Sequence, residues 1–346
     1  MLQQIQLIDT TCILLQLPCV LLATGRVAAA HEDLELGVGG ASVSSAVMEA
    51  TGATKGAMRE AYRRCGDLGD VAAEMRTAQR TLAAPAPLTV PGIYKTLLQI
   101  AREGGQGSAA RRHGAMVRLL RAARGADELR YLVRILLSNL RIGATDKLVL
   151  ASLAKASVLH RAGVGLLAAA GRESGTGPAS TASAGEAAMK QVVSQAQEEI
   201  ATAYTMRPSM EIIVKALVEG GIEAVSAACH LTPGAPVLPM LARPCNGAQE
   251  VHARLALSKA GFVAQYKYDG MRAQVHLMGH GEAKVFSRSC EDSTEQFEDA
   301  VRAVSAALQE SEEHRDDPIV VDCEIVAVDR AETPARILPF QTLATK

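Results

Sequence analysis

The spacing of apolar residues changes between the two ends of this 346-residue chain, and that change limits what the chain can fold into. From Pro91 the spacing is helical, because apolar side chains recur three and four positions apart over 93–101, 116–123 and 129–136. Over residues 262–276 apolar side chains instead alternate with polar ones, which is typical of a strand with one buried face. We therefore expect a helical array first and a sheet afterwards.

The composition and one proline-rich stretch indicate how the chain divides. Abundant Ala with Leu and Arg favours helix over most of the length. Leu231–Ala242 is rich in proline, which indicates a junction between two domains near residue 235. From the apolar spacing on either side we predict an all-α domain over residues 1–234 and an α+β domain with an antiparallel sheet over 235–346. The apolar run Cys12–Ala23 is too short to span a membrane, so we expect a buried helix and no membrane partner. Seven scattered cysteines argue against zinc or a disulfide framework and fit a reducing compartment.

The most informative short pattern is Lys267-x-Asp269-Gly270-x-Arg272. The alternation before and after it predicts two strands joined by an Asp-Gly turn. A lysine beside such a turn can present its amine in a fixed position. Partial desolvation and a nearby positive charge would keep that amine neutral and nucleophilic. Taken alone, the pattern favours an ordinary hairpin turn over a nucleophile.

Two later segments favour the chemical interpretation. Residues 283–289 predict a strand that ends in Ser287-Arg288, and the β-rich run 318–328 contains Asp322 and Glu324. The two carboxylates are two positions apart, so they share one face of their strand. Carboxylates in mid-strand, together with a lysine and two arginines, suit a site for a triphosphate and Mg²⁺.

The predicted helical domain contains one candidate phosphate contact, the segment 138–147. A helix ends there, Gly143 frees the backbone, and Thr145 or Asp146 can cap the next helix. Backbone N–H groups at a glycine beside Arg141 are suited to a phosphate, although an ordinary corner between helices is an equal alternative. Residues 111–147 hold nine Lys or Arg against three Asp or Glu, which indicates either a phosphate-facing surface or a solvated helix face.

Several runs of the chain resemble one known family. Tyr266–His276, Phe286-Ser-Arg288 and Val321–Ala327 resemble the adenylation (nucleotidyltransferase) domain of ATP-dependent DNA ligases of the eukaryotic ligase I type. Leu34–Gly39, Ala86–Val90 and Leu140–Ala144 resemble the helical DNA-binding domain of the same ligases.

The resemblance implies a mechanism and a role for single residues. Lys267 would attack the α-phosphate of ATP to form lysyl-AMP. The AMP would then pass to the 5′-phosphate of a nick in double-stranded DNA, and the 3′-hydroxyl would displace it. Arg272 and Arg288 would hold the ribose or the phosphates, and Glu324 would hold the ribose or Mg²⁺. Gln265 would read adenine, Asp269 would play a supporting part, and Pro239–Ala242 would line the adenine pocket.

The resemblance also implies a DNA contact and a setting in the cell. Asn139, Arg141, Gly143 and Thr145 would approach the minor groove of the duplex. It implies the nucleus, or alternatively an organelle that contains DNA, with replication or repair factors as possible partners.

Three departures from the family pattern stand out. Gln265 replaces the usual glutamate, Ser289 replaces an asparagine, and the sequence ends before the later motifs and the OB-fold domain. We therefore expect a fragment that binds DNA weakly and seals nicks poorly. Two alternatives stay open: an RNA ligase or capping enzyme, which share Lys-x-Asp-Gly, and a non-catalytic helical DNA-binding module.

Overall fold

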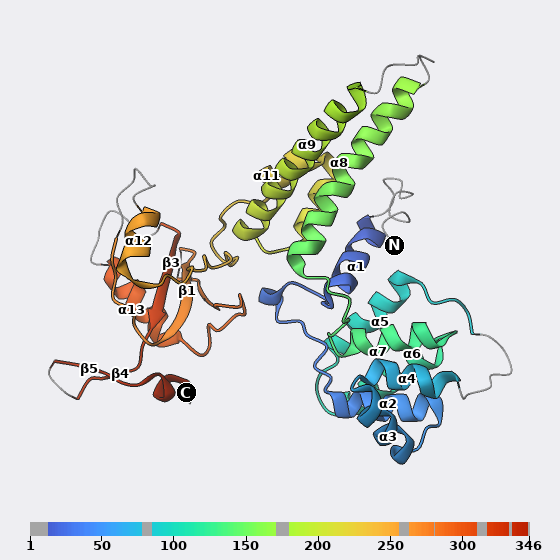
Figure 1. Ribbon diagram of the computed structural model, residues 1–346. Coiled ribbons are helices and arrows are strands. Elements are labelled where there is room, and N and C mark those ends of the chain that lie inside the picture. The colour runs from blue at the N-terminus through green and yellow to red at the C-terminus, as the bar shows by residue number, and fades with distance from the viewer. Residues whose placement is uncertain are drawn as a thin grey trace. The chain divides into compact units, whose positions relative to one another are not determined.

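The computed structural model describes residues 13–77, 85–170, 180–255, 263–279, 281–309, 317–331 and 334–344. Internal contacts divide them into two units, one running through Tyr204 with Ser209–His230, the other formed by Thr205–Pro208 with the residues from Leu231 onward. The first unit is helical and the second contains an antiparallel sheet (Figure 1), which confirms the predicted fold class and order.

The helices of the first unit begin and end where the sequence supplies caps. Thr54, Thr89 and Ser209 each accept a hydrogen bond from the backbone N–H three residues further on, which starts a helix. The helices are α1 (Ile13–Thr24), η2 (Ala30–Glu32), α2 (Gly40–Thr51), α3 (Lys55–Cys65), α4 (Leu68–Thr77), α5 (Val90–Arg102), α6 (Ser108–Arg121), α7 (Ala126–Leu136), α8 (Asp146–Ala170), α9 (Ser180–Met206), α10 (Met210–Gly220) and α11 (Ile222–Ala228). Gly52 and Gly66 adopt positive φ and end α2 and α3.

The core of this unit is aliphatic, as the near absence of aromatic residues requires. The helical groups predicted from the apolar spacing supply many of its fully buried side chains, including Leu97, Met116, Leu120, Leu129 and Leu136. Burying each of these contributes roughly 1.5–3 kcal/mol relative to leaving it exposed. A helix that turned its apolar stripe to solvent would lose most of that stabilisation, so the stripes fix how the helices pack.

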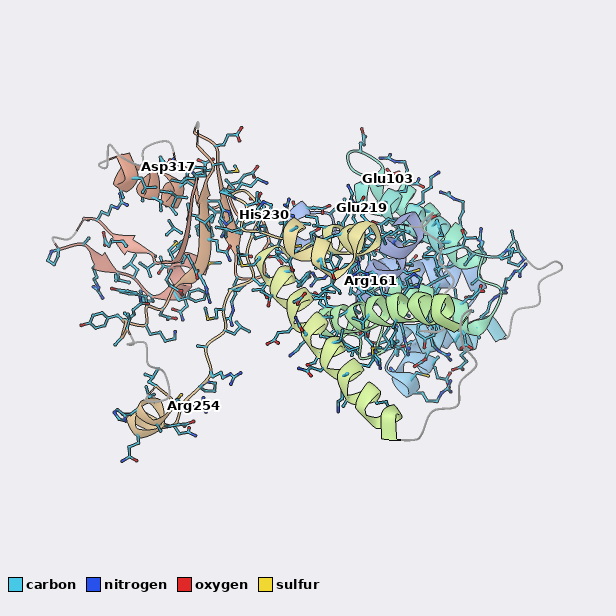
Figure 2. The ribbon with its side chains drawn as sticks, turned by 90° about the horizontal axis from the view of Figure 1, so that it is seen from above. Glu103, Arg161, Glu219, His230, Arg254 and Asp317 are labelled. Carbon is cyan, nitrogen blue, oxygen red and sulfur yellow. The ribbon has the colours of Figure 1, made fainter. Side chains whose placement is uncertain are left out.

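Arg161, a side chain of α8 that is labelled in Figure 2, contacts the junction between α10 and α11. Its guanidinium group donates to the Gly220 carbonyl at 2.7 Å and to both carboxylate oxygens of Glu223 at 3.0 and 2.7 Å. Among the described helices, none is both long and apolar enough to cross a membrane.

The second unit is a small sheet with a helix against one face. Strand β1 (Met271–Leu277) lies between β2 (Ala283–Ser287) and β3 (Ile319–Ile325), antiparallel to both. Alternate residues of β1 pack with Phe297 and the apolar side chains of α13 (Glu298–Gln309). The remaining elements are α12 (Gly247–Leu255), the paired β4 (Val328–Asp329) and β5 (Arg336–Ile337), and α14 (Phe340–Ala344).

One predicted strand is wrong. Residue 262 lies outside the described residues, but 263–269 form no strand and are exposed. The physical reason is the order of the sheet. Both edges of β1 are already paired, one with β2 and one with β3, so the preceding segment cannot return beside β1 as a hairpin arm.

Candidate functional site

The face of the sheet away from α13 is polar. Residues directly opposite each other in antiparallel strands point to the same side. Arg272 lies opposite Glu324, and Gln274 lies opposite both Asp322 and Phe286. His276 lies opposite Lys284. Polar and charged side chains of three strands therefore share the face that α13 does not cover.

This polar face is closed at one end and open at the other. His276 and Phe286 are fully buried, and their rings meet edge to face with centroids 4.9 Å apart. Gln274 is 5% exposed, whereas the Arg272 side chain is 29% exposed and Asp322 is 51% exposed. The open end, at the start of β1, is where a ligand could reach the polar side chains.

Arg272 is held in place at this open end. Its Nε and one Nη donate to the two carboxylate oxygens of Asp322 at 3.0 and 2.6 Å, and its other Nη donates to the Met240 carbonyl at 2.9 Å. The hydrogen bonds to Asp322 and the charges of Asp322 and Glu324 raise the pKa of Arg272 against the effect of desolvation. The guanidinium group is thus a fixed, permanent positive charge.

The strand register brings three of the predicted site residues to this open end of the sheet. Glu324 is directly opposite Arg272. Ser287 is opposite Ala273, so Arg288, the next residue in the turn after β2, comes level with Arg272. Lys267 and Gln265 are not part of the register, since both lie in the exposed segment that leads into β1.

Gly270 fixes how that segment enters the sheet. A Cβ atom at this position would lie 2.3 Å from the Ile325 carbonyl oxygen and 3.0 Å from a side-chain carbon of Glu324. Only a glycine lets the backbone pass this close to the end of β3. The Asp-Gly pair therefore acts through a close approach to a third strand, and not through the hairpin turn predicted from the sequence.

Asp322 was predicted as one of two carboxylates of a triphosphate and Mg²⁺ site, whereas in the structure it binds Arg272. Its spacing from Glu324 placed both on one face, and that prediction agrees with the register. Its contact with Arg272 could not be anticipated, because it depends on which strand pairs with β1 and in which register. Cys323, on the opposite face, has its pKa raised by burial and by the neighbouring carboxylates, so it is a poor nucleophile.

The loop between α7 and α8 carries the residues predicted to contact DNA. Ser138, Arg141 and Gly143 all have positive φ, at 50°, 54° and 67°. The Thr145 hydroxyl accepts the Leu148 N–H at 3.3 Å and so caps α8, which begins at Asp146. The loop is therefore a strained, defined turn at a helix N-terminus.

Asp67 anchors this loop to the rest of the helical unit. Its buried carboxylate accepts the Arg134 Nε–H at 3.0 Å and lies 3.1 Å from Arg141 Nε. Burial alone would raise the pKa of Asp67, but the Asp70 N–H and the two guanidinium groups outweigh it and hold the pKa below its ordinary value. The side chain of Arg141 remains 48% exposed, so one side of it still faces solvent.

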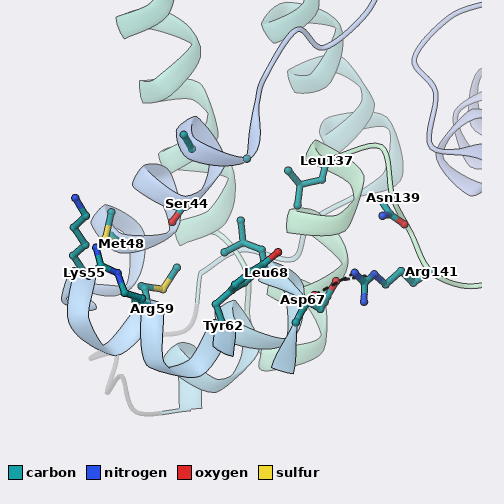
Figure 3. A pocket seen from close by; sticks show the side chains of 14 residues that line it. Ser44, Met48, Lys55, Arg59, Tyr62, Asp67, Leu68, Leu137, Asn139 and Arg141 are labelled. Atoms are coloured by element: carbon teal, nitrogen blue, oxygen red, sulfur yellow. Dashed lines mark hydrogen bonds and ion pairs between the residues drawn. The ribbon is translucent and has the colours of Figure 1, made fainter. Parts of the chain in front are cut away.

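A pocket of about 720 Å³ opens beside Arg141 (Figure 3). Asn139 and Arg141 line it on one side, and Lys55 and Arg59 of α3 line it on the other. The two α3 cations were not predicted, because they lie far outside the basic run and only the packing of α3 brings them near the loop. Their spacing of four residues on one helix is the signal that could have found them.

The basic run 111–147 is largely occupied by internal contacts. Arg111 pairs with Glu103, Arg121 with Glu49, and Arg130 with Asp70 and Asp127. Many of these charges therefore hold neighbouring helices together. A count of charges could not separate these contacts from a phosphate-facing surface.

Both units of the chain contain residues that match families of known proteins. The family described as DNA ligase N terminus matches residues 10–154, and the one described as ATP dependent DNA ligase domain matches residues 239–346. DNA ligase 6 and DNA ligase 1 of Arabidopsis thaliana are 34% and 36% identical to the chain over 330 and 327 residues. DNA ligase 1 of Schizosaccharomyces pombe is 34% identical over 330 residues.

These matches cover nearly all of this chain but a minor part of each relative. They extend over 95%, 94% and 95% of the chain, in the order given, and over 22%, 38% and 39% of the relatives.

Proposed function

We propose, for a chain that belongs to the family of ATP-dependent DNA ligases, that Lys267 captures the adenylyl group of ATP at the open edge of the sheet. The observation that carries the proposal is the strand register. It brings Arg272, Arg288 and Glu324 to the edge that the Lys267 segment enters. Two cations and a carboxylate beside the segment that carries an exposed lysine are suited to binding a nucleoside triphosphate, which supports the proposal.

The first step requires the unprotonated amine of Lys267. Its Nζ attacks the α-phosphorus of ATP, the bond to the β-phosphate oxygen breaks, pyrophosphate leaves and the amine loses its extra proton. Arg272 and Arg288 stabilise the negative charge that develops on the phosphate oxygens. Because Asp322 and the Met240 carbonyl already orient Arg272, little reorganisation is needed when the nucleotide binds. Gln265, in the same entering segment, is the proposed contact to adenine.

The residues at the edge fit a magnesium ion that arrives with ATP. Within the described ranges, no group of three metal-binding side chains comes together. Asp322 is engaged by Arg272, which leaves Glu324 as the proposed protein ligand. Mg²⁺ is commonly held by one or two carboxylates and the substrate phosphates, so a single carboxylate is enough. When bound, the ion would neutralise charge on the triphosphate.

We propose nicked double-stranded DNA as the substrate of the later steps. A 5′-phosphate oxygen at the nick would attack the AMP phosphorus and release Lys267, and the 3′-hydroxyl would then displace AMP. The support is the exposed side of Arg141 beside Gly143, in a loop that leads into the N-terminus of α8. Asn139 and Thr145 belong to the same loop, and phosphate contacts from such groups position a duplex without reading its sequence.

Transfer of label from ATP tests the proposal. The chain is incubated with Mg²⁺ and ATP labelled in either the α- or the γ-phosphate, then denatured and separated. We expect label on the protein from α-labelled ATP only, and its release when nicked duplex is added. Retention of γ-label would indicate phosphorylation, and no α-label in the wild-type chain would contradict the proposed function.

A further inference from the structure

The segment Gly234–Met240 is attached to the polar face of β1 at three places. Arg272 holds the Met240 carbonyl, Gln274 holds Val237, and His276 holds Gly234. The three side chains are alternate residues of one strand, so they point to the same side. They contact every third residue of the segment. The spacing of these side chains on β1 thus matches the spacing of the backbone groups that they contact, and no side chain of the segment takes part in these contacts.

Gln274 makes the central attachment in both directions. Its Oε1 accepts the Val237 N–H at 3.0 Å, and its Nε2 donates to the Val237 carbonyl. His276 completes the set, since its Nδ1 accepts the Gly234 N–H at 3.1 Å and its Nε2 lies 3.3 Å from Gln274 Oε1. The Gly234 contact therefore fixes the neutral tautomer with the proton on Nε2.

The segment itself is shaped for this position. Gly234 has φ of +88°, and a Cβ atom there would lie 2.5 Å from the Met278 sulfur. Pro236 is buried, whereas Met240 and Leu241 are 85% and 65% exposed. The anchored part of the segment thus ends where its apolar side chains project freely, next to Arg272.

We propose that Gln274 and His276 are positioning residues for nucleotide binding. They fix Gly234–Val237 on the sheet so that Met240, whose carbonyl Arg272 holds, and the following Leu241 form a firm wall for the base of ATP, in the stretch that the resemblance assigns to the adenine pocket. This inference rests on the proposed function. Neither residue touches the reacting atoms. Both act through the backbone, because a wall made by residues 240–242 can be no firmer than the segment that precedes it.

The test combines hydrogen exchange with nucleotide kinetics in the full chain. Gln274→Leu removes both contacts to Val237 at similar size. Gln274→Glu keeps an acceptor for the Val237 N–H and loses the donor, so it should be intermediate. Gln195→Leu, which changes an exposed glutamine of α9 paired with Glu199, is the matched control. Exchange is followed over residues 231–242, and lysyl-AMP formation is measured across ATP concentrations.

For Gln274→Leu we expect faster exchange at Val237 and a KM for ATP raised about tenfold, with kcat for lysyl-AMP formation changed less than threefold. A tenfold change corresponds to about 1.4 kcal/mol, within the range for losing hydrogen bonds of this kind. Unchanged exchange at Val237 would overturn the inference. Faster exchange with an unchanged KM would also overturn it, leaving a purely structural role. If Gln274→Leu does not fold, the same criteria apply to Gln274→Glu.

A wild-type chain that forms no lysyl-AMP would overturn both the inference and the proposed function. A labelled wild type with an unchanged KM in both Gln274 variants would overturn the inference alone. The two failures are therefore distinguishable in one set of measurements.

Discussion

Arg272 donates hydrogen bonds to both carboxylate oxygens of Asp322, at 3.0 and 2.6 Å, across the β1–β3 pair. The pair is partly exposed, with 29% of the Arg272 side chain and 51% of the Asp322 side chain accessible. Ion pairs in such surroundings contribute about 1 kcal/mol or less to stability. Orientation of the guanidinium group is therefore the main consequence of this contact.

Asp322→Asn separates orientation from stability. We expect the free energy of unfolding to fall by about 1 kcal/mol or less. Lysyl-AMP formation should slow by roughly tenfold or more, because Arg272 then has to be ordered during binding. Unfolding in denaturant and label transfer from ATP measure the two effects. Glu298→Gln removes an exposed ion pair with Arg302 in the same unit and should leave both unchanged. Equal labelling by Asp322→Asn and the wild type would contradict the role given to Asp322.

Gly270→Ala should destabilise the sheet unit. The new Cβ would lie 2.3 Å from the Ile325 carbonyl oxygen, so the backbone must move. Overpacking of this kind typically costs about 1–3 kcal/mol, which thermal unfolding would detect. Gly104→Ala has open space around the added carbon and is the control. A Gly270→Ala chain as stable as the wild type would show that the start of β1 is not held against β3.

His276 should make stability depend on pH. Burial lowers the pKa of His276 to about 4, below its ordinary value of 6.5. Between about pH 4 and pH 6.5 the unfolded chain binds a proton at His276 that the folded chain does not. The contribution of the neutral imidazole to the free energy of unfolding is therefore complete above pH 6.5 and is lost as the pH falls towards about 4. The loss should reach about 3 kcal/mol at most.

Denaturant unfolding between pH 6.5 and 5 isolates this effect, because the carboxylates with lowered pKa values titrate below that range. His276→Gln can still accept the Gly234 N–H, and its free energy of unfolding should vary less with pH than that of the wild-type chain. His252→Gln, at an exposed position of α12, should keep the wild-type slope. Equal slopes in all three chains would exclude His276 as the source.

Lys55 and Arg59 should contribute to DNA affinity through phosphate contacts. Each substitution to alanine should weaken binding of nicked duplex by a similar factor for any sequence, and reduce the slope of log K against log salt by about 1. Arg64→Ala, on the same helix but paired with Glu74, is the control. Fluorescence anisotropy at several salt concentrations measures the slopes. An unchanged slope for both variants would remove the α3 side of the pocket from the DNA interface.

Most of the fold could be predicted from the sequence, because helices and strands depend on local spacing and caps. The apolar groups around Leu97, Met116 and Leu129 are buried as predicted. The prediction of a strand before Lys267 was wrong because β1 is paired on both sides, and the sequence near Lys267 does not show which strands pair with β1. The Arg272–Asp322 contact and the attachments of Gln274 and His276 could not be predicted for the same reason, since each joins residues more than 30 positions apart.

The central claim is that the amine of Lys267 carries the adenylyl group, and peptide mapping tests it most directly. The chain is treated with ATP and Mg²⁺, digested under conditions that preserve the phosphorus–nitrogen bond, and the modified peptide is identified by mass spectrometry. We predict AMP on Lys267 in the wild-type chain, none in Lys267→Ala, and wild-type modification in Lys284→Ala. AMP on another residue, or modification that persists in Lys267→Ala, would contradict the account.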